Sequence, residues 1–205
     1  MKRLNVKTLI QSMNGSKHSN YQENFKQAIL VMDLQPRLLA NINCSTSLVE
    51  ANSILLKSAQ LLDVPAIITE QVPDKLGATM PEIFNHLEDP NIIQKDSFSA
   101  FGSSEFCDFI SRSKINRLIL TGIETSICVF LTACDAMRSG IDVTILSDCV
   151  DCRIEKDGVR CLNQLQHSGA EIIPLETFLF RHLNSSKHAS FREVSGLIKS
   201  RISSP

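Results

Sequence analysis

The sequence is poor in several features that define large classes of proteins. Its 205 residues include no tryptophan and one tyrosine, and aromatic residues make up 5%. Few rings are therefore available to stack on single-stranded nucleic acid. Lysine and arginine total 21 against 22 acidic residues, so a formal net charge of -1 gives no broad positive field for phosphates. No apolar run approaches the roughly 20 residues that cross a bilayer. We therefore expect neither nucleic acid nor a membrane as a partner.

Motifs that hold cofactors are also missing. There is no GxGxxG turn and no GxxxxGK[ST] loop, so nothing in the sequence indicates a nucleotide cofactor. Four histidines show no metal-ligand spacing, and we expect them at the surface: His86, His167, His182 and His188. We expect neither a metal nor an organic cofactor.

The seven cysteines have an odd count and no regular spacing. They are Cys44, Cys107, Cys128, Cys134, Cys149, Cys152 and Cys161. In a chain this long, the pattern favours reduced thiols of an intracellular protein over a disulfide framework. Cys149 and Cys152 form a CxxC, but a redox pair of this kind belongs at a helix N-terminus after an early strand, and this one follows the fifth predicted strand.

The first 26 residues differ from the rest of the chain. They contain five lysines or arginines and a single acidic residue, Glu23, together with several serines. We interpret residues 1–26 as a basic N-terminal extension, either a flexible tail or a weak organelle-targeting segment. Residues 27–205 form the predicted domain. We expect a cytoplasmic protein, with a mitochondrial location as the alternative.

From residue 27 onward, short apolar runs alternate with segments of helical periodicity. Six runs are predicted strands: residues 28–32, 64–69, 91–94, 117–121, 141–146 and 170–173. The predicted helices include one opened by a capping box at 47–50, one over 80–87, and one capped by Thr125 and running to Ser139. This alternation predicts an α/β fold, a three-layer α-β-α sandwich with a six-stranded parallel sheet. Doubly wound, the sheet would have the strand order 3-2-1-4-5-6.

Two candidate reactive residues follow neighbouring strands of this sheet. Asp33 ends the first strand, and the segment from Gly122 to Cys128 follows the fourth. Ligands of doubly wound sheets bind beyond the carboxyl ends of the strands at the point where the order reverses. Near a helix N-terminus, the helix dipole lowers the pKa of a thiol such as Cys128. An Asp after a buried strand has a raised pKa and can accept a proton.

Each of these residues also has an ordinary structural interpretation. Cys128 could be a core side chain of an apolar helix, and Asp33 could cap the following turn. Lys95 follows the third strand, where a cation stabilises a nearby thiolate, but such a lysine can equally be a solvated surface charge.

Four runs of the sequence resemble one known family. They are ILVMDLQ (29–35), TEQVPDKLGAT (69–79), KDSFSAFGSSEF (95–106) and the segment 118–150 around TGIETSICVF. In order and spacing they are similar to the isochorismatase-like hydrolases, and within these to the isochorismatase domain-containing proteins. The resemblance covers about residues 27–183.

The resemblance implies a catalytic triad of Asp33, Lys95 and Cys128. In that family the Asp takes the thiol proton, the Lys stabilises the charged pair and the Cys attacks a carbonyl. The family also has a cis peptide before the nucleophile, which corresponds here to Ile123–Glu124. The backbone N–H groups of Glu124 and Cys128 would then form the oxyanion hole.

Four more residues are candidates for the site. Gln35 matches a family residue near the site and is expected to orient the triad or the substrate. Phe98, Phe101 and Ile127 are candidates for an apolar substrate pocket, although each could be ordinary core. Family members that bind a metal carry histidines after the second strand. Residues 69–75 here contain none, so the expectation of no metal stands.

We therefore expect a hydrolase of a small carbonyl compound, in particular an amide with a C–N bond, acting through Cys128. Its partner would be a small-molecule substrate, and by resemblance the chain would form a homo-oligomer. The alternatives are a catalytically weak binding or scaffold protein, or a thiol sensor, on the same fold. A nuclease role, named for some relatives of this branch, is disfavoured by the near-neutral charge.

Overall fold

The computed structural model describes residues 26–87 and 89–203. Its centre is a six-stranded, all-parallel sheet with the order β3-β2-β1-β4-β5-β6. The strands are β1 (Gln27–Met32), β2 (Ala66–Gln71), β3 (Asn91–Lys95), β4 (Arg117–Ile123), β5 (Asp142–Asp151) and β6 (Glu171–Ile173). The predicted fold class and strand order are confirmed. All but Lys26 of the predicted extension 1–26 lies outside the described residues.

β1 is buried on both faces of the sheet, as its unbroken apolar run requires. Ile29 and Val31 pack into the hydrophobic core on one face, whereas Leu30 and Met32 pack into the core on the other. Successive side chains of a strand point to opposite faces, so a strand covered on both sides must be apolar at every position.

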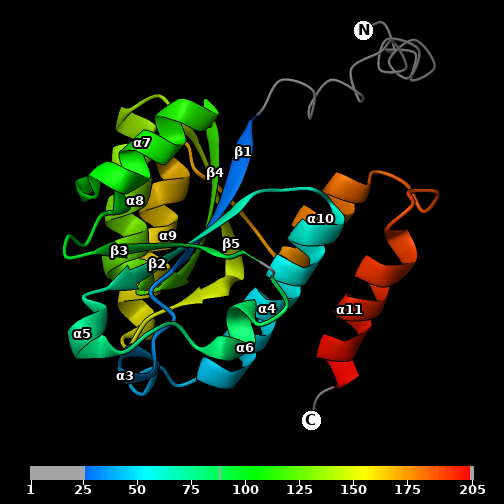
Figure 1. Cartoon of the computed structure of the whole chain (residues 1–205), viewed down its shortest axis with the longest axis horizontal. Helices are drawn as coiled ribbons and strands as arrows, with labels where there is room; N and C mark the ends of the chain where they lie inside the picture. The colour runs from blue at the N-terminus through cyan, green and yellow to red at the C-terminus, as the bar shows by residue number, and fades with distance from the viewer. Residues whose placement is uncertain (1–25, 88, 204–205) are drawn as a thin grey trace, which may run out of the picture.

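Helices cover both faces (Figure 1). One layer contains α4 (Ser45–Leu61), α6 (Pro81–Phe84), α10 (Leu175–Leu183) and α11 (Phe191–Ser203). The opposite layer contains α7 (Ser104–Ser113), α8 (Phe130–Arg138) and α9 (Glu155–His167). Two short helices, α3 (Pro36–Leu39) and α5 (Pro73–Leu76), follow β1 and β2. No helix in the described ranges combines the length and apolarity that crossing a membrane requires.

Several predicted boundaries are wrong. α4 begins at Ser45, two residues before the expected capping box, and the Ser47 hydroxyl donates instead to the carbonyl of Cys44. α6 ends at Phe84 rather than residue 87. β5 continues to Asp151 because its later residues pair with the end of β4, and Cys149 is therefore a buried strand residue.

The strand register brings the ends of four strands to one edge of the sheet. Met32, the last residue of β1, lies opposite Thr69 of β2 and Gly122 of β4. Gln71 of β2 lies opposite Lys95 of β3. A Cβ on Gly122 would lie 2.1 Å from the Met32 carbonyl oxygen, and Gly122 has φ +94°, so this close approach of β4 to β1 requires glycine.

Candidate active site

Asp33 follows β1 at the point where the strand order reverses. Its backbone has φ 57°, a left-handed conformation that Asp tolerates better than most residues. The side chain is fully buried, and both carboxylate oxygens are occupied. Oδ1 accepts from the Thr69 hydroxyl at 2.8 Å, and Oδ2 accepts from Lys95 Nζ at 2.8 Å.

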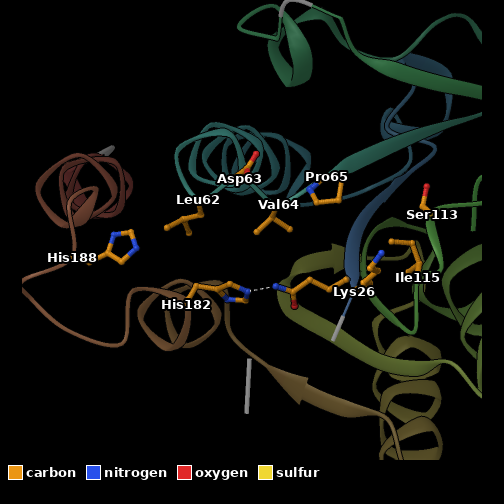
Figure 2. A pocket seen from close by; sticks show the side chains of 10 residues that line it. Lys26, Leu62, Asp63, Val64, Pro65, Ser113, Ile115, His182 and His188 are labelled. Atoms are coloured by element: carbon orange, nitrogen blue, oxygen red, sulfur yellow. Dashed lines mark hydrogen bonds between the residues drawn. The ribbon is translucent and has the colours of Figure 1, made fainter. Parts of the chain in front are cut away.

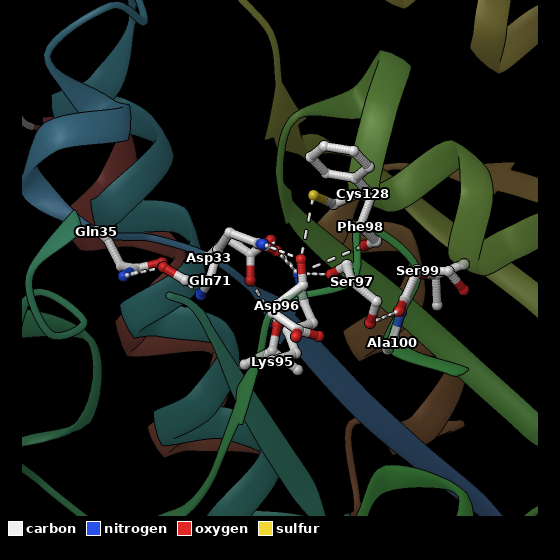
Figure 3. A network of polar contacts seen from close by, with 12 residues as sticks. Asp33, Gln35, Gln71, Lys95, Asp96, Ser97, Phe98, Ser99, Ala100 and Cys128 are labelled. Carbon is white, nitrogen blue, oxygen red and sulfur yellow. Dashed lines mark hydrogen bonds and ion pairs between the residues drawn. The ribbon is translucent and has the colours of Figure 1, made fainter. Parts of the chain in front are cut away.

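Lys95, the last residue of β3, joins Asp33 to Cys128 (Figure 3). Its ammonium donates to Asp33 and to Gln71 Oε1, at 2.8 and 2.6 Å. It also contacts the carbonyls of Ser97 and Phe98 at 3.2 and 3.4 Å, and its Nζ lies 3.9 Å from Cys128 Sγ. Neither side chain of the Asp33–Lys95 pair is exposed to solvent. A surface-lysine interpretation therefore does not fit Lys95.

Cys128 lies on a widened helical turn directly after β4. The Ile123–Glu124 peptide bond is cis, as the family resemblance implies, and residues Thr125–Val129 (η2) form a π-helical turn that leads into α8. The Glu124 carbonyl accepts from the N–H groups of both Ile127 and Val129. The predicted cap is therefore wrong: Glu124 occupies the N-cap position, and Thr125 is the first residue of the turn.

The expected acidity of Cys128 is also wrong. Burial and, after it, the charge of the neighbouring Asp33 carboxylate raise the pKa of this thiol to about 12, although Lys95 and the Glu124 backbone N–H act in the opposite direction. Burial likewise raises the pKa of Asp33, and the charge of Lys95 opposes that effect. Desolvation and a nearby like charge outweigh the helix N-terminus. At rest, Cys128 is therefore a thiol next to a carboxylate that can take its proton.

Two glutamines hold the lysine in place. Gln35 is fully buried, and its side chain bonds to the backbone N–H and carbonyl of Gln71 and to the carbonyl of Gly77. Gln71 in turn accepts from Lys95 and donates to the carbonyl of Asp96. Gln35 is thus placed to orient the triad through Gln71. The sequence analysis missed Gln71 and Thr69. Pairing the predicted second strand with its neighbours would have placed Thr69 at this edge, whereas Gln71 lies two residues beyond the predicted end of that strand.

The predicted pocket residues take different positions. Phe98 is 59% exposed, and Figure 3 draws its ring on the side of the Cys128 sulfur that faces away from Asp33. Phe101 packs edge-on against Phe106, with ring centroids 5.2 Å apart. Ile127 borders a separate hollow of about 420 Å³ beside α9. The structure therefore places Phe98 at the nucleophile and the other two in neighbouring contacts.

The Glu124 side chain points out of the triad. Its two carboxylate oxygens accept from the side-chain Nε and the backbone N–H of Arg153, at 2.8 and 3.2 Å. What Glu124 presents to the sulfur of Cys128 is its backbone N–H. That placement suits the oxyanion role that the family resemblance implies.

A hollow of about 480 Å³ lies at the opposite end of the sheet, where β1 begins (Figure 2). His182 reaches into it and contacts the Gln27 side chain. The expectation of a surface position is wrong for His182, which is partly buried because α10 packs beside the start of β1. None of the triad residues lines this hollow.

The described residues hold neither a metal-binding cluster nor a disulfide. Within residues 26–87 and 89–203, no group of three or more histidines, cysteines or acidic residues could hold a metal ion. All seven cysteines are free thiols. Burial raises the pKa of both Cys149 and Cys152, and the Cys152 thiol donates to the carbonyl of Ile154. Neither cysteine of the CxxC belongs to α9, which begins at Glu155, although the Cys152 sulfur lies against the first turn of that helix at Gly158.

Comparisons with known proteins agree with this fold. Residues 27–177 match the isochorismatase domain. The chain is 32% identical to the isochorismatase domain-containing protein 2 of Danio rerio over 170 residues, which cover 83% of this chain and 85% of the relative. The MAR1 ribonuclease of Caenorhabditis elegans has a TM-score of 0.79 at 31% identity, covering 84% of this chain and 89% of that one.

Two more distant structures share the fold. YcaC from Pseudomonas aeruginosa, solved with hexane-2,5-diol and covalent acrylamide, has a TM-score of 0.75 at 19% identity over 88% of this chain and 97% of its own. YcaC from Escherichia coli, described as an octameric hydrolase of unknown specificity, has a TM-score of 0.73 at 19% identity, with coverages of 86% and 94%. Since the matched domain spans most of the folded residues, the chain belongs to the isochorismatase-like hydrolase family.

Proposed function

We propose that the protein hydrolyses the C–N bond of a small amide through an Asp33, Lys95 and Cys128 triad. One observation carries the proposal. A fully buried Asp33–Lys95 ion pair lies against a nearly buried thiol, with Lys95 Nζ 3.9 Å from Cys128 Sγ. Burying an ion pair is costly, and such perturbed groups concentrate at functional sites.

The first half-reaction transfers the acyl group to sulfur. Asp33 takes the proton of the Cys128 thiol as sulfur attacks the carbonyl carbon, and the C=O electron pair moves onto oxygen. The backbone N–H groups of Glu124 and Cys128 stabilise this oxyanion. The tetrahedral adduct collapses, the C–N bond breaks, and Asp33 returns the proton to the departing nitrogen. A thioester on Cys128 and a free amine remain.

Water completes the cycle in the second half-reaction. Asp33 accepts a proton from water, whose oxygen attacks the thioester carbonyl. The C–S bond then breaks, and Cys128 regains its proton while the carboxylic acid leaves. The Lys95 ammonium stays protonated throughout and balances the negative charge that passes between Asp33 and sulfur. Each proton and electron pair is thereby assigned to a residue of this chain, without a metal or organic cofactor.

The comparisons support this proposal from two sides. The family consists of hydrolases, and YcaC from Pseudomonas aeruginosa, which shares the fold, was solved with covalent acrylamide, an alkylating agent that reports a reactive nucleophile in that protein. The octameric state of another YcaC supports a homo-oligomeric assembly for this chain as part of the proposal.

The test is turnover of a panel of small primary amides, followed by ammonia release. Wild type should hydrolyse at least one amide, and Cys128→Ala and Cys128→Ser should lose that activity while keeping a wild-type unfolding midpoint. Cys161→Ala, a thiol replacement on α9, is the matched control and should retain turnover. Activity that survives in Cys128→Ala would overturn the proposal.

A second candidate is RNA cleavage, because the Caenorhabditis elegans protein at 31% identity is named a ribonuclease. The formal net charge of -1 gives this chain little attraction for a polyanion. Incubating the wild type and Cys128→Ala with labelled RNA separates the two. Cleavage by wild type that Cys128→Ala lacks would favour the nuclease.

A further inference from the structure

We propose that this site selects uncharged substrates: small neutral amides that carry neither a carboxylate nor an ammonium group. The inference rests on the proposed function and specifies its substrate class. It is carried by the way in which the charges around Cys128 are already paired.

The ammonium of Lys95, which lies near the Cys128 sulfur, has no N–H donor left for a ligand. A lysine has three N–H donors. Those of Lys95 are shared among Asp33 Oδ2, Gln71 Oε1 and the carbonyls of Ser97 and Phe98. The side chain is fully buried, so it cannot turn toward a substrate carboxylate without leaving Asp33 unpaired in the interior.

The carboxylate beside it already has a cationic partner. Asp33 accepts from Lys95 with one oxygen and from Thr69 with the other. A substrate ammonium would meet the charge of Lys95, and a substrate carboxylate would meet the charge of Asp33. Because the pair is neutral as a whole, neither kind of ion gains an electrostatic partner at the sulfur.

The charges on the other side of the nucleophile turn are balanced too. The hollow of about 420 Å³ beside Ile127 is lined by two acids, Glu124 and Asp157, and two bases, Arg153 and Arg160. Glu124 and Arg153 are already joined in an ion pair. At the sulfur itself, the exposed side chain is the uncharged ring of Phe98.

Neutral selection also has a consequence for turnover. Hydrolysis converts an uncharged amide into a carboxylate, the type of ion that this arrangement leaves without a partner. We therefore expect the acid product to bind more weakly than the substrate, so that product release is favoured and product inhibition is small.

The experiment compares two alkylating agents that differ in one group. Iodoacetamide is neutral and iodoacetate is anionic, and both react alike: the S–C bond forms, the C–I bond breaks, iodide leaves and the thiol proton passes to the base. The rate of each agent is followed at every cysteine by mass spectrometry. Exposed Cys44 gives the intrinsic ratio of the two agents. At Cys128, the ratio of the iodoacetamide rate to the iodoacetate rate should exceed the ratio at Cys44 by about tenfold or more.

Two variants sharpen the result. Phe98→Arg adds a cation at an exposed position beside the sulfur and should shift the ratio at Cys128 toward iodoacetate. Val159→Arg, at a position on α9 that is 52% exposed, adds the same charge as a matched control and should leave the ratio unchanged. If Cys128 reacts with both agents in the ratio shown by Cys44, neutral selection is overturned and the proposed nucleophile stands. If Cys128 reacts with neither agent in the folded protein, both proposals are overturned.

Discussion

Replacing Asp33 by Asn should abolish turnover and at the same time make the Cys128 thiol more acidic. Asn cannot take the thiol proton, so the base is lost. After burial, the charge of Asp33 is the largest cause that holds the pKa of Cys128 at about 12. Without that charge, the ammonium of Lys95, 3.9 Å from the sulfur, has a thiolate as its remaining anionic partner. The pKa of Cys128 should therefore fall below about 12.

The same substitution should weaken the fold. Removing one member of a buried ion pair leaves the other charge uncompensated, which costs about 3–5 kcal/mol in the free energy of unfolding. Here both side chains are fully buried and 2.8 Å apart, so the full penalty is expected. Partial compensation by the Cys128 thiolate should make this cost smaller at high pH than at neutral pH.

The assay combines urea unfolding with the pH dependence of Cys128 alkylation by iodoacetamide. Asp63→Asn is the matched control, because Asp63 has φ 55° where Asp33 has φ 57°, but it is exposed at the other end of the sheet. The control should retain turnover, stability and thiol reactivity. The reasoning is refuted if Asp33→Asn unfolds like Asp63→Asn, or if the pKa of Cys128 does not fall.

Three further predictions concern the support of the triad. Gln71→Leu removes an acceptor of Lys95, so kcat should fall while KM changes little. The free energy of unfolding of this variant should be about 1–3 kcal/mol lower than that of the wild type. Gln71→Glu should restore part of kcat. The free energy of unfolding should fall by up to about 4 kcal/mol as pH rises from about 9 to 12, because Cys128 loses its proton at lower pH in the unfolded chain than in the folded one. In denaturation experiments on Cys128→Ala, the free energy of unfolding should depend less on pH. Gly122→Ala should lower the unfolding midpoint in a thermal melt and impair turnover, since its Cβ would meet Met32; a wild-type melt would contradict this.

Most of the scaffold was predictable because its causes are local. Continuous apolar runs such as the one in β1 indicate strands buried on both faces, and their alternation with helical periodicity leads to a parallel sheet. The boundaries were less predictable. The end of β5 depends on a partner distant in the chain, since Val150 pairs with Gly122 of β4.

The candidate site was also predictable only in part. Asp33, Lys95 and Cys128 could be selected as candidates because each follows the carboxyl end of a strand, and the family motifs assigned their roles. Gln71 was missed because its importance comes from a single contact with Lys95, 24 residues away. Phe101 was included because an aromatic residue after a strand looks the same in sequence whether it faces a ligand or Phe106.

Apolar periodicity and the alternation of strands with helices can be read along the chain, and they were enough to predict the parallel sheet and the edge where the candidate residues meet. The charge balance at that edge could not be read in this way, because it arises on folding. The pKa of Cys128 depends on desolvation and on Asp33 and Lys95, which are 95 and 33 residues away and come within reach only when β1, β3 and β4 align. Electrostatic interactions depend on distance in space and on exclusion of water, and both of these arise on folding.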